Sequence, residues 1–175
     1  MTIPLLLFYL IKYKFYYMLP NFLQDLFKNQ QYNPESFFLI AGPCVVESEE
    51  IVMEIADTVS NTCKQLGIPY VFKASYRKAN RTSASSFTGL GDDLGLALIK
   101  KTGDKYGLPT TSDVHAHDEC AEAAKYIDIL QIPAFLSRQT DLLLAAAATG
   151  KVVNVKKGQF LAPWDMKNVA KKLDA

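Results

Sequence analysis

The sequence has few of the features that mark several common classes of protein. It contains only three cysteines (Cys44, Cys63 and Cys120) and no CxxC pair, so we expect no disulfide scaffold and a reducing, cytoplasmic compartment. Basic and acidic residues nearly balance, at 19 and 18, which gives no reason to expect a nucleic-acid surface. The apolar run at 3–11 is nine residues long, whereas a membrane-spanning helix needs about twenty. We therefore expect neither nucleic acid nor membrane among its partners.

Two catalytic patterns are also missing. No predicted strand is followed by GxGxxG, which argues against a dinucleotide-binding sheet. No pair of carboxylates stands out, which argues against glycosidase chemistry.

The first 36 residues differ from the rest of the chain and are interpreted as an N-terminal extension. The positive charges Lys12 and Lys14 follow the apolar run, whereas a secretory signal carries its charges before the run. Met18 opens a more ordinary sequence, so our hypothesis is that residues 1–17 are not native. A membrane anchor is the less favoured alternative for this run.

From residue 37 to the end, apolar strand patterns alternate with amphipathic helix patterns five times. The first helix is predicted to start after Ser48 as N-cap, to end at Gly67, and to bury a stripe in steps of four from Ile51 to Cys63. The segment 37–46 is predicted to contain a fully buried strand that ends at 42–43, and the other predicted strands are 70–72, 109–115, 127–132 and 152–155. The later predicted helices are 94–106, 118–126, 141–149 and 163–173.

This alternation is typical of βαβ units around a parallel sheet. Polar residues gather where the predicted strands end, which is the active-site edge of a (β/α)₈ barrel. A full barrel takes about 250 residues, so we expect an incomplete TIM barrel of about five units over residues 37–175.

The stretch 72–83, reading FKASYRKANRTS, is the most informative segment. It follows a hydrophobic strand and places Arg77, Lys78, Asn80 and Arg81 within five positions. Clustered Lys and Arg without a carboxylate pair favour anionic ligands such as phosphates and carboxylates. The plain alternative is a solvated charged turn.

Five segments, IAGPCVVES, FKASYRKANRTS, TTSDVH, LQIPAFLSRQTDLL and NVKKGQFLAPWDMKN, together resemble the 3-deoxy-8-phosphooctulonate synthase (KDO8P synthase, 2-dehydro-3-deoxyphosphooctonate aldolase) family. The resemblance runs from about Phe37 to the last residue. It implies a (β/α)₈ barrel, a homotetramer, and condensation of phosphoenolpyruvate with arabinose 5-phosphate in lipopolysaccharide precursor synthesis.

The resemblance also implies roles for individual residues. The implied phosphoenolpyruvate-binding residues are Lys73, Ser75, Lys78, Gln131, Pro133, Ala134 and Lys156. The implied arabinose 5-phosphate-binding residues are Asn80, Arg81, Thr82, Ser83 and Arg138, with Arg138 reaching a neighbouring subunit's site. Catalytic roles are implied for Lys78, Asn80, Asp113 and His115. His115 is alternatively a core histidine.

Cys44 follows Gly-Pro, where metal-dependent members of this family carry cysteine. The resemblance therefore implies a divalent metal (Zn, Fe, Mn or Co), with the other ligands expected beyond residue 175; the alternative is a buried structural cysteine. Arg77, Ser85 and Thr88 depart from the family pattern. We expect a C-terminally truncated member that is inactive, or nearly so, as an isolated chain.

Three rival interpretations remain open. One is a DAHP synthase-like enzyme using erythrose 4-phosphate, which is disfavoured because the sequence has KANR in place of a Lys-Pro-Arg-Thr-like motif. Another is a Schiff-base aldolase that uses Lys73 or Lys156. The third is a barrel fragment without catalytic activity.

Overall fold

The computed structural model describes residues 19–174, and the predictions for residues 1–17 lie outside this part of the chain. The elements are α2 (Leu19–Leu26), β1 (Leu39–Ala41), α3 (Glu49–Leu66), β2 (Tyr70–Lys73), α4 (Asp92–Tyr106), β3 (Thr110–Asp113), η1 (His117–Glu119), α5 (Cys120–Ala123), β4 (Ile129–Ile132), η2 (Ala134–Leu136), α6 (Thr140–Ala148), β5 (Val152–Val155), η3 (Pro163–Asp165) and α7 (Met166–Leu173). No helix within this part of the chain is both long and apolar enough to cross a membrane.

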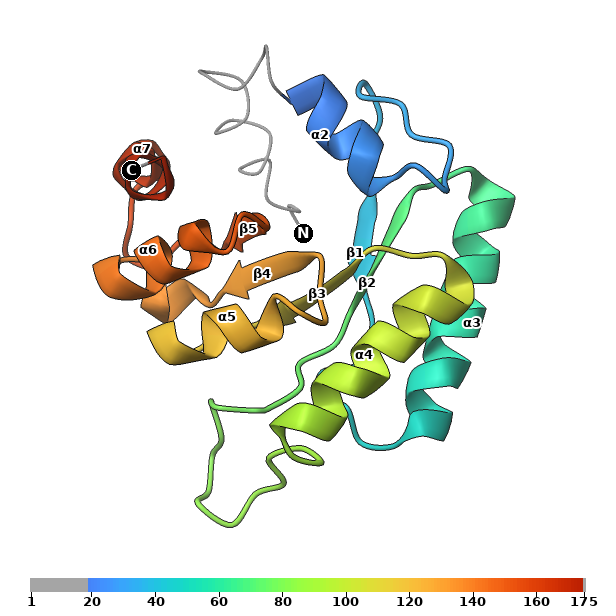
Figure 1. Cartoon of the computed structure of the whole chain (residues 1–175), viewed down its shortest axis with the longest axis horizontal. Helices are drawn as coiled ribbons and strands as arrows, with labels where there is room; N and C mark the ends of the chain where they lie inside the picture. Colours follow the sequence, from blue (N-terminus) through green and yellow to red (C-terminus); the bar gives the residue numbers. More distant parts are fainter. Residues whose placement is uncertain (1–18, 175) are drawn as a thin grey trace.

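The five strands form one parallel sheet in the order β1-β2-β3-β4-β5. A doubly wound sheet reverses its strand order near the middle, whereas strands in simple chain order are those of a barrel wall. Figure 1 shows α3, α4, α5 and α6 around the outside of this arc. The predicted fold class, an incomplete (β/α) barrel of about five units, is confirmed.

Alternation along each strand sends side chains to two different cores. On β2, Tyr70 and Phe72 pack outward in the large cluster shared with the helices. Val71 points the other way and packs with Ile129 of β4 and with Phe27. The concave face of the arc therefore has an apolar floor near the amino ends of the strands, which leaves its opposite edge for polar side chains.

The segment before β1 helps to build this floor. Phe27, which follows α2, is 1% exposed and stacks on Tyr32 with ring centroids 5.1 Å apart. The side chain of Gln30 accepts a hydrogen bond from Tyr70 N (2.7 Å) and donates one to Tyr70 O (2.8 Å), which satisfies the backbone where β2 begins. Residues 23–32 thus pack on the sheet as part of the same folded unit.

Several predicted elements differ from the structure. The strand predicted as fully buried, β1, is only half-buried along its length, because within residues 19–174 no strand pairs with its outer edge. Strand β3 is shorter than predicted, and the predicted helix at 118–126 is a 3₁₀ turn followed by the four-residue α5.

Helix α3 has the predicted N-cap Ser48 and C-terminal Gly67, and Cys63 is buried as predicted, but the rest of the predicted buried stripe is displaced by one position. The buried residues are Val52, Ala56, Ser60 and Cys63, whereas Ile51 is 41% exposed. The small Ala and Ser side chains on the buried face let the helix approach the sheet closely.

Candidate active site

A layer of polar side chains crosses the concave face at the carboxyl ends of the strands. The register places Asp113 of β3 beside Gln131 of β4, and Gln131 beside Asn154 of β5. Lys73 Nζ donates to Ser75 Oγ (2.9 Å), and Ser75 Oγ donates to Asp113 Oδ2 (2.8 Å). Gln131 Nε2 donates to Asp113 Oδ1 (2.7 Å) and accepts, through Oε1, from Asn154 Nδ2 (3.0 Å). The structure thus joins Lys73, Ser75, Asp113 and Gln131 in one network.

Asp113 supplies the negative charge of this layer. Burial alone raises the pKa of its carboxyl group, but hydrogen bonds from Gln131 and Ser75 and the charges of Lys73 and Lys156 outweigh burial and hold the pKa below its ordinary value. Lys73 Nζ lies 3.5 Å from Asp113 Oδ2, and both side chains are mostly buried. Two lysines around one carboxylate leave a net positive charge, which suits an anionic ligand.

The exit of β1 brings a second group of predicted residues close to the layer. A Cβ atom on Gly42 would lie 2.0 Å from the carbonyl oxygen of Lys73, so only glycine allows this approach. Lys78 Nζ donates to Cys44 Sγ at 2.7 Å. Cys44 is exposed, so the alternative of a buried structural cysteine is wrong for this position.

The described residues do not by themselves fit a metal centre. Within residues 19–174, no group of three or more His, Cys, Asp or Glu side chains is arranged to hold a metal ion. A protein zinc site takes at least three protein ligands, and Cys44 supplies one sulfur atom.

The residues expected to bind the sugar phosphate lie on the long connection between β2 and α4. Asn80, Arg81, Thr82 and Ser83 are all exposed. Arg81 Nη1 donates to the carbonyl oxygens of two residues of its own loop, at 3.0 and 3.2 Å. This segment is therefore held by local contacts and has no hydrogen bond to the polar layer.

The remaining predicted binding residues lie beside β4 and β5. Pro133 and Ala134 follow β4 directly and are half-buried, and the backbone N–H of Lys156 donates to Ile132 O at 3.0 Å. Arg138 is exposed on the turn before α6. These positions border the carboxyl edge without joining its hydrogen-bond network.

His115 lies in a different cluster from Asp113. Its backbone N–H donates to Glu119 Oε2 at 2.8 Å, and its ring lies edge-on to Tyr76 with centroids 6.2 Å apart. Its buried Nδ1 has no hydrogen-bond partner among the described residues and is 3.5 Å from Glu119 Oε2. Among the described residues, His115 therefore makes no hydrogen bond to the Asp113 network.

Of the carboxyl groups at this edge, Glu119 has the most strongly lowered pKa. Burial raises its pKa, but hydrogen bonds from His115 and Tyr76 and the charge of Arg77 outweigh burial and lower the pKa to about 2. Because the folded-state pKa lies below the ordinary value of 4.5, the stabilisation by ionised Glu119 is complete above about pH 4.5 and is lost as the pH falls towards 2.

We predict that Glu119→Gln, which cannot titrate, is less stable than the wild type at pH 6. The difference should shrink steadily between pH 4.5 and 2. Urea unfolding at several pH values measures it, and the other carboxylates titrate alike in both proteins. A difference that stays constant from pH 6 to pH 2 would contradict the assignment.

Sequence reasoning missed two residues of this edge. Asn154 occupies an inward position of β5, two residues before Lys156, so strand alternation could have identified it. Glu119 is four residues from His115, a spacing that brings side chains together only once a helical turn is recognised. Its other partners, Tyr76 and Arg77, are more than forty residues away in the sequence, and no local pattern indicates them.

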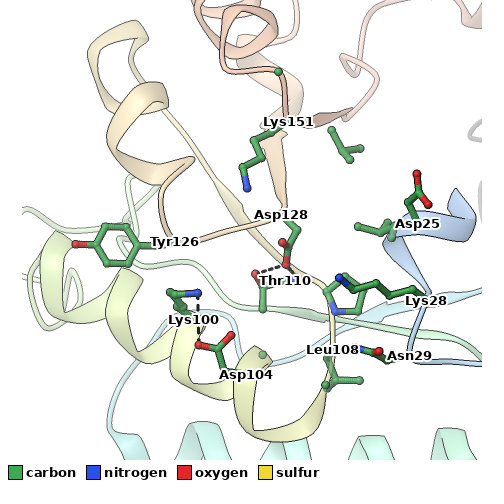
Figure 2. Close-up of a pocket in the computed structure, with 16 residues that line it drawn as sticks. Asp25, Lys28, Asn29, Lys100, Asp104, Leu108, Thr110, Tyr126, Asp128 and Lys151 are labelled. Atoms are coloured by element: carbon green, nitrogen blue, oxygen red, sulfur yellow. Dashed lines mark hydrogen bonds and ion pairs between the residues drawn. The ribbon is translucent and has the colours of Figure 1, made fainter. Parts of the chain in front are cut away.

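A cavity of about 510 Å³ lies at the opposite, amino ends of β3, β4 and β5. Figure 2 shows two of its polar pairs, Thr110 with Asp128 and Lys100 with Asp104. Its lining includes three lysines (Lys28, Lys100, Lys151) and three aspartates (Asp25, Asp104, Asp128). With these charges balanced it favours no anion, so the carboxyl edge is the better candidate for the site.

Comparison with known proteins identifies the family of this chain. A family model described as the DAHP synthetase I family matches residues 30–175. A 2-dehydro-3-deoxyphosphooctonate aldolase of Fusobacterium nucleatum subsp. nucleatum is 56% identical over 138 residues, which cover 79% of this chain and 50% of that protein. Proteins of the same name from Trichlorobacter lovleyi (58% over 137 residues, 78% and 50%) and Rickettsia bellii (54% over 143 residues, 82% and 52%) are similar.

The chain spans about half the length of these curated relatives. The matched part includes every strand of the arc and the whole polar layer, and the relatives carry the name expected from the sequence motifs. The chain belongs to the DAHP synthetase I family.

Proposed function

We propose that this chain forms the first half of an enzyme that condenses phosphoenolpyruvate with D-arabinose 5-phosphate, giving 3-deoxy-D-manno-octulosonate 8-phosphate and inorganic phosphate. The observation that carries the proposal is the hydrogen-bonded layer from Lys73 to Asn154, with two lysines around one carboxylate at the carboxyl edge of the arc. The names of its relatives, 54–58% identical, support the choice of substrates.

In this proposal the layer binds phosphoenolpyruvate. Lys73, Lys78 and Lys156 hold its phosphate and carboxylate, and Ser75 and Gln131 supply neutral hydrogen bonds beside Pro133 and Ala134. Asp113 holds Lys73 in place and keeps Gln131 oriented with its Nε2 towards the β3 side of the layer. Fixed cations of this kind stabilise charge in a transition state without reorganising.

The exposed loop residues Asn80, Arg81, Thr82 and Ser83, with Arg138 of a neighbouring subunit, bind arabinose 5-phosphate. The enol carbon then bonds to the sugar aldehyde, water adds to the adjacent carbon, and the C–O bond to phosphate breaks. Because the protein's task is to place two anions together, most of the rate gain comes from positioning.

Further parts of the proposal rest on family resemblance. Cys44 would supply one thiolate ligand to a divalent metal, whose other ligands lie outside residues 19–174. The complete protein would be a cytoplasmic homotetramer. Since the described residues do not form a metal centre, no step of the reaction is assigned to the metal.

Two rival activities have less support. A Schiff-base aldolase that uses Lys73 or Lys156 needs a lysine free to attack a carbonyl. Lys73 donates to Ser75 and pairs with Asp113, so Lys156 is the better candidate for that chemistry. Use of erythrose 4-phosphate is the activity suggested by the name of the family model, whereas the individual relatives carry the name of the octonate aldolase.

The test is phosphate release from phosphoenolpyruvate plus arabinose 5-phosphate, with and without EDTA. It compares the chain alone with the chain joined to the part of the Fusobacterium nucleatum relative that it does not match. We expect turnover only in the joined, metal-replete protein. Turnover by the isolated chain would contradict its expected inactivity, and turnover unaffected by EDTA would contradict the metal role of Cys44.

A further inference from the structure

The connection between β2 and α4 has a closed neck. The backbone N–H of Lys78 donates to Thr88 O at 2.8 Å, so residues 78–88 leave and return at one point. Gly89 has φ +131°, and a Cβ atom there would lie 2.6 Å from Tyr76 O. The loop stands out from the body of the arc in Figure 1, so its position depends on how this neck is attached.

One carboxylate attaches the neck to the rest of the structure. Glu119 Oε2 accepts hydrogen bonds from Tyr76 Oη (2.6 Å) and from the backbone N–H of His115 (2.8 Å). Glu119 Oε1 pairs with Arg77, whose other terminal nitrogen lies 3.2 Å from Asp92 Oδ2. Glu119 thus links the exits of β2 and β3, and Arg77 extends the link to the start of α4.

The contacts of Glu119 are largely shielded from solvent, so they should contribute to stability. Tyr76 is 1% exposed, and the side chain of Glu119 is 18% exposed. Hydrogen bonds to charged groups contribute more than neutral ones, and three of them converge on one side chain. By contrast, the nearby pair of Lys125 and Glu122 is exposed at the end of α5 and should contribute little.

The residues anchored by Glu119 immediately precede those expected to bind the sugar phosphate. Arg77 is followed by Lys78, and Asn80 to Ser83 lie in the loop that the neck closes. Arg81 makes its hydrogen bonds only within that loop, among the described residues. Within residues 19–174, no hydrogen bond of its own therefore ties this arginine to the sheet.

We propose that Glu119 is a positioning residue, which acts through Tyr76 and Arg77 to hold the neck of the loop 78–88 at the exits of β2 and β3 and so sets the affinity for the sugar phosphate. This ligand rests on the proposed function. The attachment of the loop by Glu119 is independent of the proposed function, because it can be measured without substrate.

The experiment is amide hydrogen exchange by mass spectrometry on this chain, as wild type, Glu119→Ala, Arg77→Ala, the double variant, and the matched control Glu122→Ala. We expect exchange in residues 77–91 to quicken on the order of tenfold in both single variants. Exchange in the double variant should be no faster than in either single variant, because the two side chains act as one unit. Exchange in α3 should stay unchanged, and Glu122→Ala should match the wild type throughout.

Titration of the same variants, made in the joined protein, with D-arabinose 5-phosphate and with phosphoenolpyruvate gives the second readout. We expect Glu119→Ala to weaken binding of the sugar phosphate on the order of tenfold and to leave the affinity for phosphoenolpyruvate unchanged. General destabilisation of the fold would not separate the two affinities in this way. Unchanged exchange in residues 77–91, or an equal rise in α3, would overturn the proposal. Loosened exchange without any sugar phosphate binding by the joined wild-type protein would support the attachment and contradict the proposed function.

Discussion

Replacing Gly42 by alanine should lower the free energy of unfolding by about 3 kcal/mol or more. The new Cβ atom would lie 2.0 Å from the carbonyl oxygen of Lys73 and 3.0 Å from its carbonyl carbon. Both are backbone atoms of a central strand and cannot move aside as a flexible side chain can. Gly42 also has φ +151°, a conformation that L side chains rarely adopt. Chemical unfolding measures the change.

Gly67→Ala is the matched control, because it separates backbone strain from collision. Gly67 has φ +66°, but nothing lies within 4 Å of a Cβ atom placed there. Gly67→Ala should therefore lower the free energy of unfolding only by the strain of a left-handed backbone conformation, about 1–2 kcal/mol. Equal losses for the two variants would show that β1 does not approach β2 as closely as described.

Asp113→Ala should lower the free energy of unfolding by about 2–3 kcal/mol. The substitution leaves Gln131 Nε2 without its acceptor and Lys73 without its carboxylate partner, on side chains that are largely buried. In the joined, active protein the same variant should lose most of its activity, because Lys73 is no longer held. Unfolding curves and initial rates of phosphate release test the two effects.

Asp104→Ala provides the control for this prediction. Asp104 pairs with Lys100 on the surface of α4, with side chains 68% and 50% exposed, so its loss should cost less than about 0.5 kcal/mol. If Asp113→Ala were as mild as Asp104→Ala, the polar layer would not be the cooperative network described here.

Local signals were enough to predict much of the fold. Strand β5 has the predicted bounds, 152–155, because a short apolar run lies between Gly150 and a pair of lysines. Helix α3 begins after its predicted cap, where Ser48 Oγ accepts from Ile51 N, and ends at Gly67 in the left-handed conformation. These features depend on residues that are close together in the sequence.

Predictions failed where distant contacts decide the structure. The segment after β3 was predicted as one helix, but Glu119 bonds to Tyr76 and Arg77 of another connection, and the chain there forms a 3₁₀ turn and a short helix. The same contacts place the ring of His115 edge-on to Tyr76. No spacing within the segment could have revealed partners that lie on a different loop.

For the site, strand alternation and the parallel sheet were sufficient to bring together Lys73, Asp113 and Gln131, since carboxyl ends of parallel strands share one edge. The exact links were not predictable, because they depend on which side-chain atoms meet across the sheet. Asn154 completes the layer at β5 and was overlooked for this reason.

The most direct test of the account is the choice of sugar phosphate by the joined protein. Phosphate release from phosphoenolpyruvate is measured with arabinose 5-phosphate and, separately, with erythrose 4-phosphate at equal concentration. The account predicts release with arabinose 5-phosphate at least about tenfold faster, as discrimination of a few kcal/mol allows. Equal or faster release with erythrose 4-phosphate, or none with either sugar, would contradict it.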